Sequence, residues 1–137
     1  MKVMDYQLDL VNSQLDIQVD FDRGSFFACP VFGKQDCKAY DTEERVWRQL
    51  NFFQYKAFIH ARNPRVNCPT HGIKRVLVPW SRPGSGFTML MEAMILFLAK
   101  EMTVMAVAKT IRERDTRIWR VLEHYISEEV KKIDSPR

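Results

Sequence analysis

The most constraining feature of the sequence is a short segment at which the periodicity of the apolar residues changes. Residues 79–86 contain two prolines and two glycines in eight positions. Before this segment apolar and polar residues alternate with a period of two, and after it apolar residues recur at helical spacing. A chain of 137 residues holds one ordinary domain or two small ones. We therefore expect an α+β protein with three parts: a β-rich domain over 1–80, a Pro/Gly hinge over 81–86 and a helical domain over 87–137.

The first part of the chain has the alternation of half-buried strands. Leu15, Ile17, Val19 and Phe21 alternate with polar residues and are followed by a turn at residues 22–24. A second β-rich stretch is predicted over residues 45–67, interrupted at Asn63-Pro64, and a further strand over 73–78.

The last part of the chain predicts three helices. The first is capped by Ser85 or Thr88 and ends near Glu101, the second is capped by Thr103, and the third is capped by Asp115 or Thr116. The second and third helices are joined by a short polar turn at residues 112–114, which is typical of a helix-turn-helix motif.

In a helix-turn-helix motif the later helix enters the major groove. Four residues near the start of the third helix are predicted to face outward and contact DNA: Thr116, Arg117, Trp119 and Arg120. Arg117 and Arg120 are expected to read bases, because a guanidinium donates two hydrogen bonds to guanine. The alternatives are an ordinary three-helix bundle with a basic surface and, for Trp119, packing against the neighbouring domain.

Charge is distributed unevenly along the chain, although the net charge is only +4. Residues 1–44 carry nine acidic and four basic residues, whereas residues 45–91 carry eight basic residues and no acidic one. A basic stretch interleaved with aromatic residues is typical of binding to the phosphate backbone. We expect phosphate contacts from four of its arginines: Arg48, Arg62, Arg65 and Arg82. The alternative is a basic face that only contacts solvent.

Two short segments have the form of zinc knuckles. Cys29 and Cys68 are each followed by Pro, and a Gly closes each segment four residues after its cysteine. His71 occupies the second ligand position of the later knuckle, whereas Phe32, which cannot bind a metal, occupies that of the earlier one. Cys37 is the remaining thiol that can complete a Cys3His set, so the sequence predicts a structural zinc ion and a zinc-ribbon-like form for the β-rich domain over 1–80. The alternative is a set of buried thiols without metal.

Other classes of protein are not indicated. The most apolar stretch, residues 87–99, contains Glu92 and is shorter than the roughly twenty residues of a membrane span. The N-terminus lacks the apolar core of a secretory signal, so a cytoplasmic location without membrane contact is expected. No nucleotide-binding or hydrolase motif occurs, and we expect no enzymatic activity.

The order of the motifs resembles the N-terminal region of bacterial insertion-sequence transposases of the ISL-three type. The resemblance covers roughly residues 15–127 and rests on the two knuckles and on the segments at 40–42, 45–48, 51–54, 60–66, 78–88 and 115–122. It implies that Cys29, Cys68 and His71 match zinc positions and that residues 116–122 match the recognition helix. Phe32 departs from the Cys-Pro-x-Cys-Gly pattern of the family. In that family a larger RNase H-like catalytic domain follows.

Only twelve residues follow Tyr125, so we expect the chain to lack that catalytic domain. The expected function is recognition of the terminal inverted repeats of an insertion sequence in double-stranded DNA. One alternative is a truncated regulatory fragment that represses the full-length transposase, by occupying the same ends or by forming mixed oligomers with it. The expected protein partners are the full-length transposase or a second copy of the chain. Another is a protein-interaction module that does not bind DNA.

Overall fold

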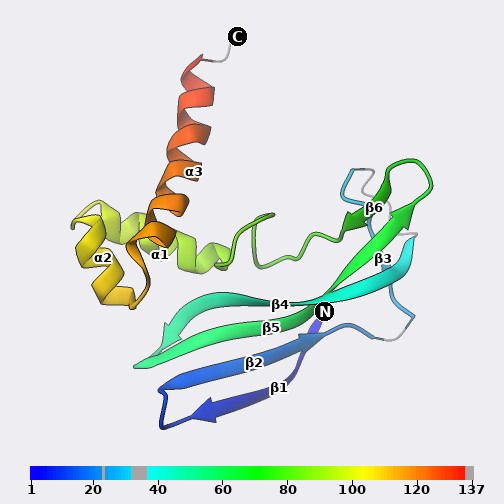
Figure 1. Ribbon diagram of the computed structural model, residues 1–137, viewed down its shortest axis with the longest axis horizontal. Coiled ribbons are helices and arrows are strands. Elements are labelled where there is room, and N and C mark those ends of the chain that lie inside the picture. Colours follow the sequence, from blue (N-terminus) through cyan, green and yellow to red (C-terminus); the bar gives the residue numbers. More distant parts are fainter. Residues whose placement is uncertain (23, 32–36, 135–137) are drawn as a thin grey trace. The chain divides into compact units, whose positions relative to one another are not determined.

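The structure is a computed structural model that describes residues 1–22, 24–31 and 37–134. Within these residues the chain forms one mixed sheet and three helices (Figure 1), which confirms the α+β class. The chain divides into two compact units, residues 1–89 and 90–137, which we call the sheet unit and the helical unit. The division therefore lies at the start of the first helix, beyond the hinge predicted at 81–86.

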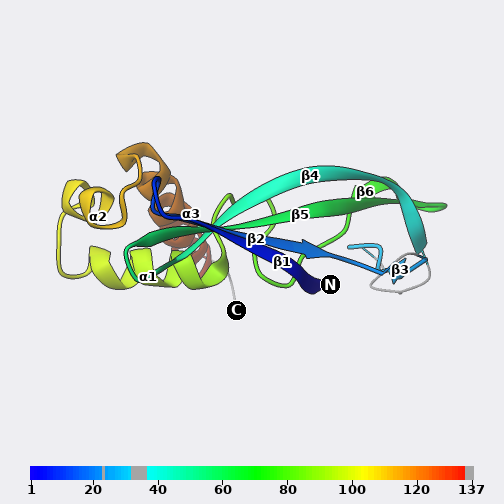
Figure 2. The same ribbon diagram turned by 90° about the horizontal axis from the view of Figure 1, so that it is seen from below.

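The sheet unit contains six strands over the described residues: β1 (Lys2–Asp9), β2 (Gln14–Asp20), β3 (Phe26–Phe27), β4 (Cys37–Phe52), β5 (Tyr55–Cys68) and β6 (Gly72–Arg75). Their order in the sheet is β1-β2-β5-β4-β3, and β6 pairs with β5 beyond the end of β2 (Figure 2). The pairing of β2 with β5 is parallel, and the other pairings are antiparallel. The alternation at residues 15–21 is accounted for by β2, whereas β1 was not predicted.

β5 continues through Asn63-Pro64, where the sequence predicts an interruption. On one side of β5, pairing with β2 ends at Ala61 and pairing with β6 begins at Arg65. Pro64 lies opposite Val76, the residue after β6, and its carbonyl accepts a hydrogen bond from Val76 N at 2.9 Å. Pro64 has no N–H to donate in return, and Val76 O accepts a hydrogen bond from Asn63 Nδ2 at 3.0 Å instead. A proline is tolerated at this position because the Asn63 amide replaces the missing backbone donor.

The core of the sheet unit lies on one face of the central strands. Trp47 of β4 packs with Ile59 and Ala61 of β5, and Val19, Val78 and Trp80 are partly buried against them. The rings of Trp47 and Trp80 meet edge to face, with centroids 5.3 Å apart. This contact helps to hold the segment after β6 against the sheet, because an edge-to-face aromatic pair stabilises packing beyond the apolar area that it buries.

Backbone hydrogen bonds attach residues 81–88 to the sheet unit. Arg48 N donates to Gly86 O at 2.8 Å, and Thr88 N donates to Arg48 O at 2.9 Å. The buried Ser81 hydroxyl donates to Phe87 O at 2.8 Å. The segment therefore pairs with the edge of β4 at Arg48. This pairing explains why the compact unit extends to Met89. Hinge motion at 81–86 stays a prediction.

The helical unit follows the predicted pattern. α1 spans Met89–Ala99, α2 spans Val104–Ile111 and α3 spans Asp115–Asp134. Thr103 caps α2, since its hydroxyl accepts a hydrogen bond from Ala106 N at 3.2 Å. Val107 and Ile111 of α2 and Ile118 and Val121 of α3 are buried, which forms the core of the helix pair. Among the described residues, no helix is long and apolar enough to cross a membrane.

Candidate metal centre and nucleic-acid interface

Three of the predicted zinc ligands lie together in the sheet unit. Cys29 follows β3, Cys68 ends β5 and His71 lies in the turn before β6. Their donor atoms all lie within 4.8 Å of one another, with His71 Nδ1 3.6 Å from Cys68 Sγ and 3.8 Å from Cys29 Sγ. Gly72, with a φ of +76°, lets the chain turn directly after His71. The later knuckle thus presents both its ligands to Cys29.

The three residues fit a structural zinc ion. In a tetrahedral site with Zn–S of about 2.3 Å and Zn–N of about 2.0 Å, sulfur and nitrogen ligands lie about 3.6 Å apart. Both cysteines are buried, with exposed fractions of 1% for Cys29 and 3% for Cys68, while His71 is partly exposed. Two thiols and an imidazole match the borderline-soft character of zinc. The geometry and the donor chemistry therefore agree.

The fourth ligand position is less defined. Cys37 begins β4, faces Phe27 in the strand register and is partly exposed. It does not belong to the group formed by Cys29, Cys68 and His71. Phe32, at the ligand position of the earlier knuckle, lies outside the described residues. A Cys3His set that includes Cys37 stays a prediction.

α3 has one buried and one exposed face in its first two turns. Ile118 and Val121 are 0% and 2% exposed. Thr116, Trp119, Arg120 and Glu123 are exposed and lie at helical spacing on the other side. Trp119 has an exposed fraction of 48%. The helix therefore presents a continuous surface that contains three of the four residues predicted to contact DNA.

The two arginines predicted to read bases differ in their surroundings. Arg117 is partly buried, and its Nη1 donates to Glu113 Oε2 at 2.9 Å. Arg120 is exposed and makes no ion pair to a residue in the described part of the chain. Of the two, Arg120 is the one that a ligand can reach without displacing a carboxylate.

Three arginines of the sheet unit are paired with acidic residues of its first half: Arg62, Arg65 and Arg75. Arg62 makes a bidentate contact with Asp20, with Nη2 3.0 Å from both carboxylate oxygens. Arg65 pairs with Asp41, its Nε donating at 2.6 Å, and its Nε also lies 3.6 Å from Glu43 Oε1. A hydrogen bond from Arg65 holds the pKa of Asp41 below its usual range. A phosphate would have to compete with these carboxylates for Arg62 and Arg65.

The expectation that Arg48 contacts a phosphate needs correction. Its side chain is 1% exposed, although it lies in a strand that the sequence indicates is basic. Its Nη2 donates to Asn51 Oδ1 at 2.6 Å, and its guanidinium lies 5.8 Å from the centre of the Phe58 ring. Arg48 is thus part of the interior of the protein, where a backbone phosphate does not reach.

A small hollow in the sheet unit brings together arginines that are far apart in the sequence. Its volume is about 160 Å³, and Arg45, Arg75 and Arg82 contribute to its lining. We call it the arginine hollow. Sequence reasoning selected Arg82 but not Arg45 or Arg75 as an individual contact. The signal for Arg45 was present, because it precedes Trp47 by two positions and a strand places such residues on the same face.

Comparisons with known proteins find matches to residues in both units. Residues 25–71 match the zinc-finger of transposase IS204/IS1001/IS1096/IS1165, and residues 76–126 match the helix-turn-helix domain of transposase family ISL3. A transposase for insertion sequence element IS1557, from two strains of Mycobacterium tuberculosis, is 33% identical over 90 residues. That match covers 66% of this chain and 20% of the relative, so the chain spans about a fifth of the length of these curated relatives. No solved structure matches it significantly.

Proposed function

Because the chain carries the zinc-finger and helix-turn-helix regions of ISL3-family transposases, we propose that it binds double-stranded DNA and recognises the terminal inverted repeats of an insertion sequence. The exposed face of α3 is the observation that carries this proposal. It begins at the start of the helix, it carries polar, aromatic and cationic groups, and the opposite face is buried against α2. A recognition helix requires this division, since one face holds the fold while the other enters the major groove.

Within that face, Arg120 is the proposed base-reading residue. An exposed guanidinium without a carboxylate partner among the described residues is able to donate two hydrogen bonds to guanine O6 and N7. Thr116 and Trp119 are proposed to contact the backbone or bases beside it. Arg117 would read DNA only by exchanging its contact with Glu113, so its contribution is proposed to be smaller.

Zinc would have a structural part in this function. Cys29, Cys68 and His71 would hold it, with Cys37 as the proposed fourth ligand, and the ion would supply a cross-link between distant parts of the chain. Cys29 and Cys68 are separated by most of β4 and β5. The ligands therefore connect the segment after β3 to the end of the hairpin formed by β4 and β5. Small domains with limited cores need such cross-links for stability.

The proposal is tested by the affinity of the zinc-loaded chain for an inverted-repeat duplex and for a scrambled duplex of the same composition. Replacing Arg120 by Ala should cost about 1–3 kcal/mol of binding to the repeat, and less on the scrambled duplex, because a bidentate base contact discriminates by that amount. Lys132→Ala is the matched control, since Lys132 is a cation farther along α3 that pairs with Glu129 at 3.1 Å. Equal losses on both duplexes would remove the base-reading role of Arg120. If the unmodified chain bound neither duplex, the function would be wrong and a protein-interaction module would be favoured.

A further inference from the structure

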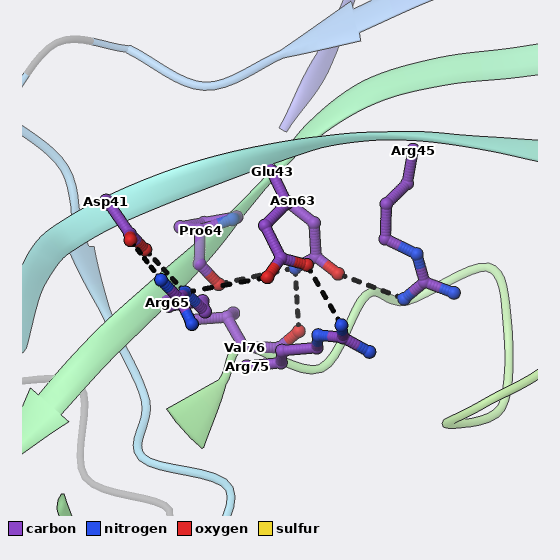
Figure 3. Close-up of polar contacts among 8 residues, drawn as sticks. All are labelled: Asp41, Glu43, Arg45, Asn63, Pro64, Arg65, Arg75 and Val76. Carbon is purple, nitrogen blue, oxygen red and sulfur yellow. Dashed lines mark hydrogen bonds and ion pairs between the residues drawn. The ribbon is translucent and has the colours of Figure 1, made fainter. Parts of the chain in front are cut away.

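A row of alternating charges crosses β4, β5 and β6 on one face of the sheet (Figure 3). Asp41 pairs with Arg65, Arg65 approaches Glu43, and Glu43 Oε2 lies 3.1 Å from Arg75 Nη2. Asp41 and Glu43 are opposite Arg65 and Asn63 in the register of β4 and β5, and Arg65 is opposite Arg75 in that of β5 and β6. The acidic and basic groups thus balance in pairs along this part of the row.

The balance ends at Arg45, which is the next residue of β4 on the same face. Its Nη1 donates to Asn63 Oδ1 at 3.3 Å, and its guanidinium lies 4.8 Å from the centre of the Trp47 ring. In the described residues it makes no ion pair with a carboxylate. Burial and the neighbouring charge of Arg75 lower the pKa of Arg45. The fold therefore holds the Arg45 guanidinium, oriented by the Trp47 ring and the Asn63 amide, near the positive charge of Arg75.

Arg45 and Arg75 both contribute to the lining of the arginine hollow. Besides Arg45, Arg75 and Arg82, the hollow is lined by neutral residues: Trp47, Asn63, Val76, Leu77, Val78, Ser81, Pro83 and Gly84. No carboxylate is among the lining residues that the structure describes. Three arginines contribute to this lining, and Arg75 also pairs with Glu43 at 3.1 Å, so the cationic side chains exceed the carboxylate beside them. Such a site attracts an oxyanion, and guanidinium forks match the geometry of phosphate oxygens.

We propose that the arginine hollow binds one phosphate group of the DNA backbone, a role that rests on the DNA binding proposed above. Two polar side chains of the lining are held by hydrogen bonds: Asn63 Nδ2 donates to Val76 O at 3.0 Å, and the buried Ser81 hydroxyl donates to Phe87 O at 2.8 Å. A bound phosphate would supply Arg45 with the anionic partner that Arg75 has in Glu43. The contact would carry no sequence information, and it would fix the register of the sheet unit on the duplex.

The first test compares two neutralising substitutions on opposite faces of the sheet. Arg45→Gln should reduce the slope of log affinity against log salt by about 0.9, since each phosphate contact releases about one counterion. The loss should be equal on the repeat and the scrambled duplex. Arg62→Gln, which removes the same charge from a residue already paired with Asp20, should leave the slope unchanged. Equal effects of the two substitutions, or none for Arg45→Gln, would overturn the proposal.

The second test identifies the phosphate. Phosphates of the repeat are replaced one at a time by neutral methylphosphonate. We expect one position at which the unmodified chain loses affinity and Arg45→Gln loses none. If, at every position, the loss of affinity caused by the methylphosphonate added to the loss caused by Arg45→Gln, the hollow would hold no backbone phosphate. Arg82→Gln provides a second variant in case Arg45→Gln fails to fold, which circular dichroism and zinc content report.

Two further outcomes separate this inference from the function on which it rests. If Arg120→Ala reduced discrimination between duplexes while Arg45→Gln and Arg82→Gln bound like the unmodified chain, only the hollow would be wrongly assigned. Binding to neither duplex would overturn both proposals. Titration with inorganic phosphate, followed by the NMR signals of the arginine Nε–H groups, tests the other source of the ligand. Saturation by free phosphate without any effect of Arg45→Gln on DNA binding would contradict the DNA contact.

Discussion

The sheet unit and the helical unit use their basic residues differently. In the sheet unit, Arg62, Arg65 and Arg75 each pair with a carboxylate of β2 or β4. In the helical unit, Lys109, Arg114 and Arg120 are exposed and make no ion pair to a described residue. The sheet unit has the longer run without an acidic residue, over positions 45–89, yet three arginines of that run are neutralised by carboxylates from elsewhere in the sequence.

The difference shows that charge counted along a chain is a poor guide to surface charge in a sheet. Arg62 and Asp20 are separated by 42 positions, and pairing of β2 with β5 brings them together. A helix neutralises charge mainly between residues three or four positions apart, as Glu113 and Arg117 do. Sequence patterns therefore predict the exposed cations of helices better than those of sheets.

The largest effect should come from the metal ligands, which concern only the sheet unit. Cys68→Ser removes one of two buried thiols, and structural zinc contributes roughly 10 kcal/mol or more to folding in small zinc domains. We expect loss of bound zinc, measured by atomic absorption, and rapid amide exchange throughout β5 and β6. Thr70→Ser in the same exposed turn is the control and should keep both zinc and protection. Full zinc content in Cys68→Ser would show that Cys68 is not a ligand.

A smaller effect should follow from unmasking a paired arginine. Asp20→Asn leaves Arg62 without its carboxylate, so the guanidinium becomes available to a phosphate. We expect the salt slope of DNA binding to become steeper by up to about 0.9, with similar gains on repeat and scrambled duplexes. Asp5→Asn removes the same charge from β1 without releasing an arginine. If both variants changed binding equally, only net charge would matter and the contrast between the units would fail.

The smallest effect concerns the titration of Asp41. Arg65 lowers the pKa of this carboxyl, so the pair stabilises the fold above the unfolded pKa of about 3.9 and the contribution is lost as pH falls through the lower folded value. In Arg65→Gln the pKa of Asp41, followed by NMR of its carboxyl carbon, should rise toward the usual range. Arg62→Gln should leave it in place. No change in Arg65→Gln would mean that another group sets this pKa.

Much of the helical unit was predictable from the sequence. The spacing of Val107, Ile111, Ile118 and Val121 and the cap at Thr103 are local signals, and helices are stabilised mainly by residues a few positions apart. The close approach of Cys29, Cys68 and His71 was predicted because both knuckles have the same local form. These features needed no knowledge of which strands pair.

The sheet unit was less predictable, because its properties depend on pairing between distant segments. All but one residue of β1 are exposed, so the strand has no alternation between buried and exposed positions that a pattern would reveal. The burial of Arg48 and the pairing of Pro64 with Val76 depend on which segments flank β4 and β5. The arginine hollow likewise depends on the loop after β6 returning to the face that carries Trp47.

The most direct test of the account is fluorescence anisotropy of the zinc-loaded chain on a duplex of the proposed inverted repeat and on a scrambled duplex, at two salt concentrations. The account predicts salt-dependent binding to both, with a preference of about tenfold or more for the repeat, since a few base contacts from α3 supply at least 1.4 kcal/mol. Equal affinity for the two duplexes would contradict sequence recognition by α3. Absence of binding to either would contradict the proposed function itself.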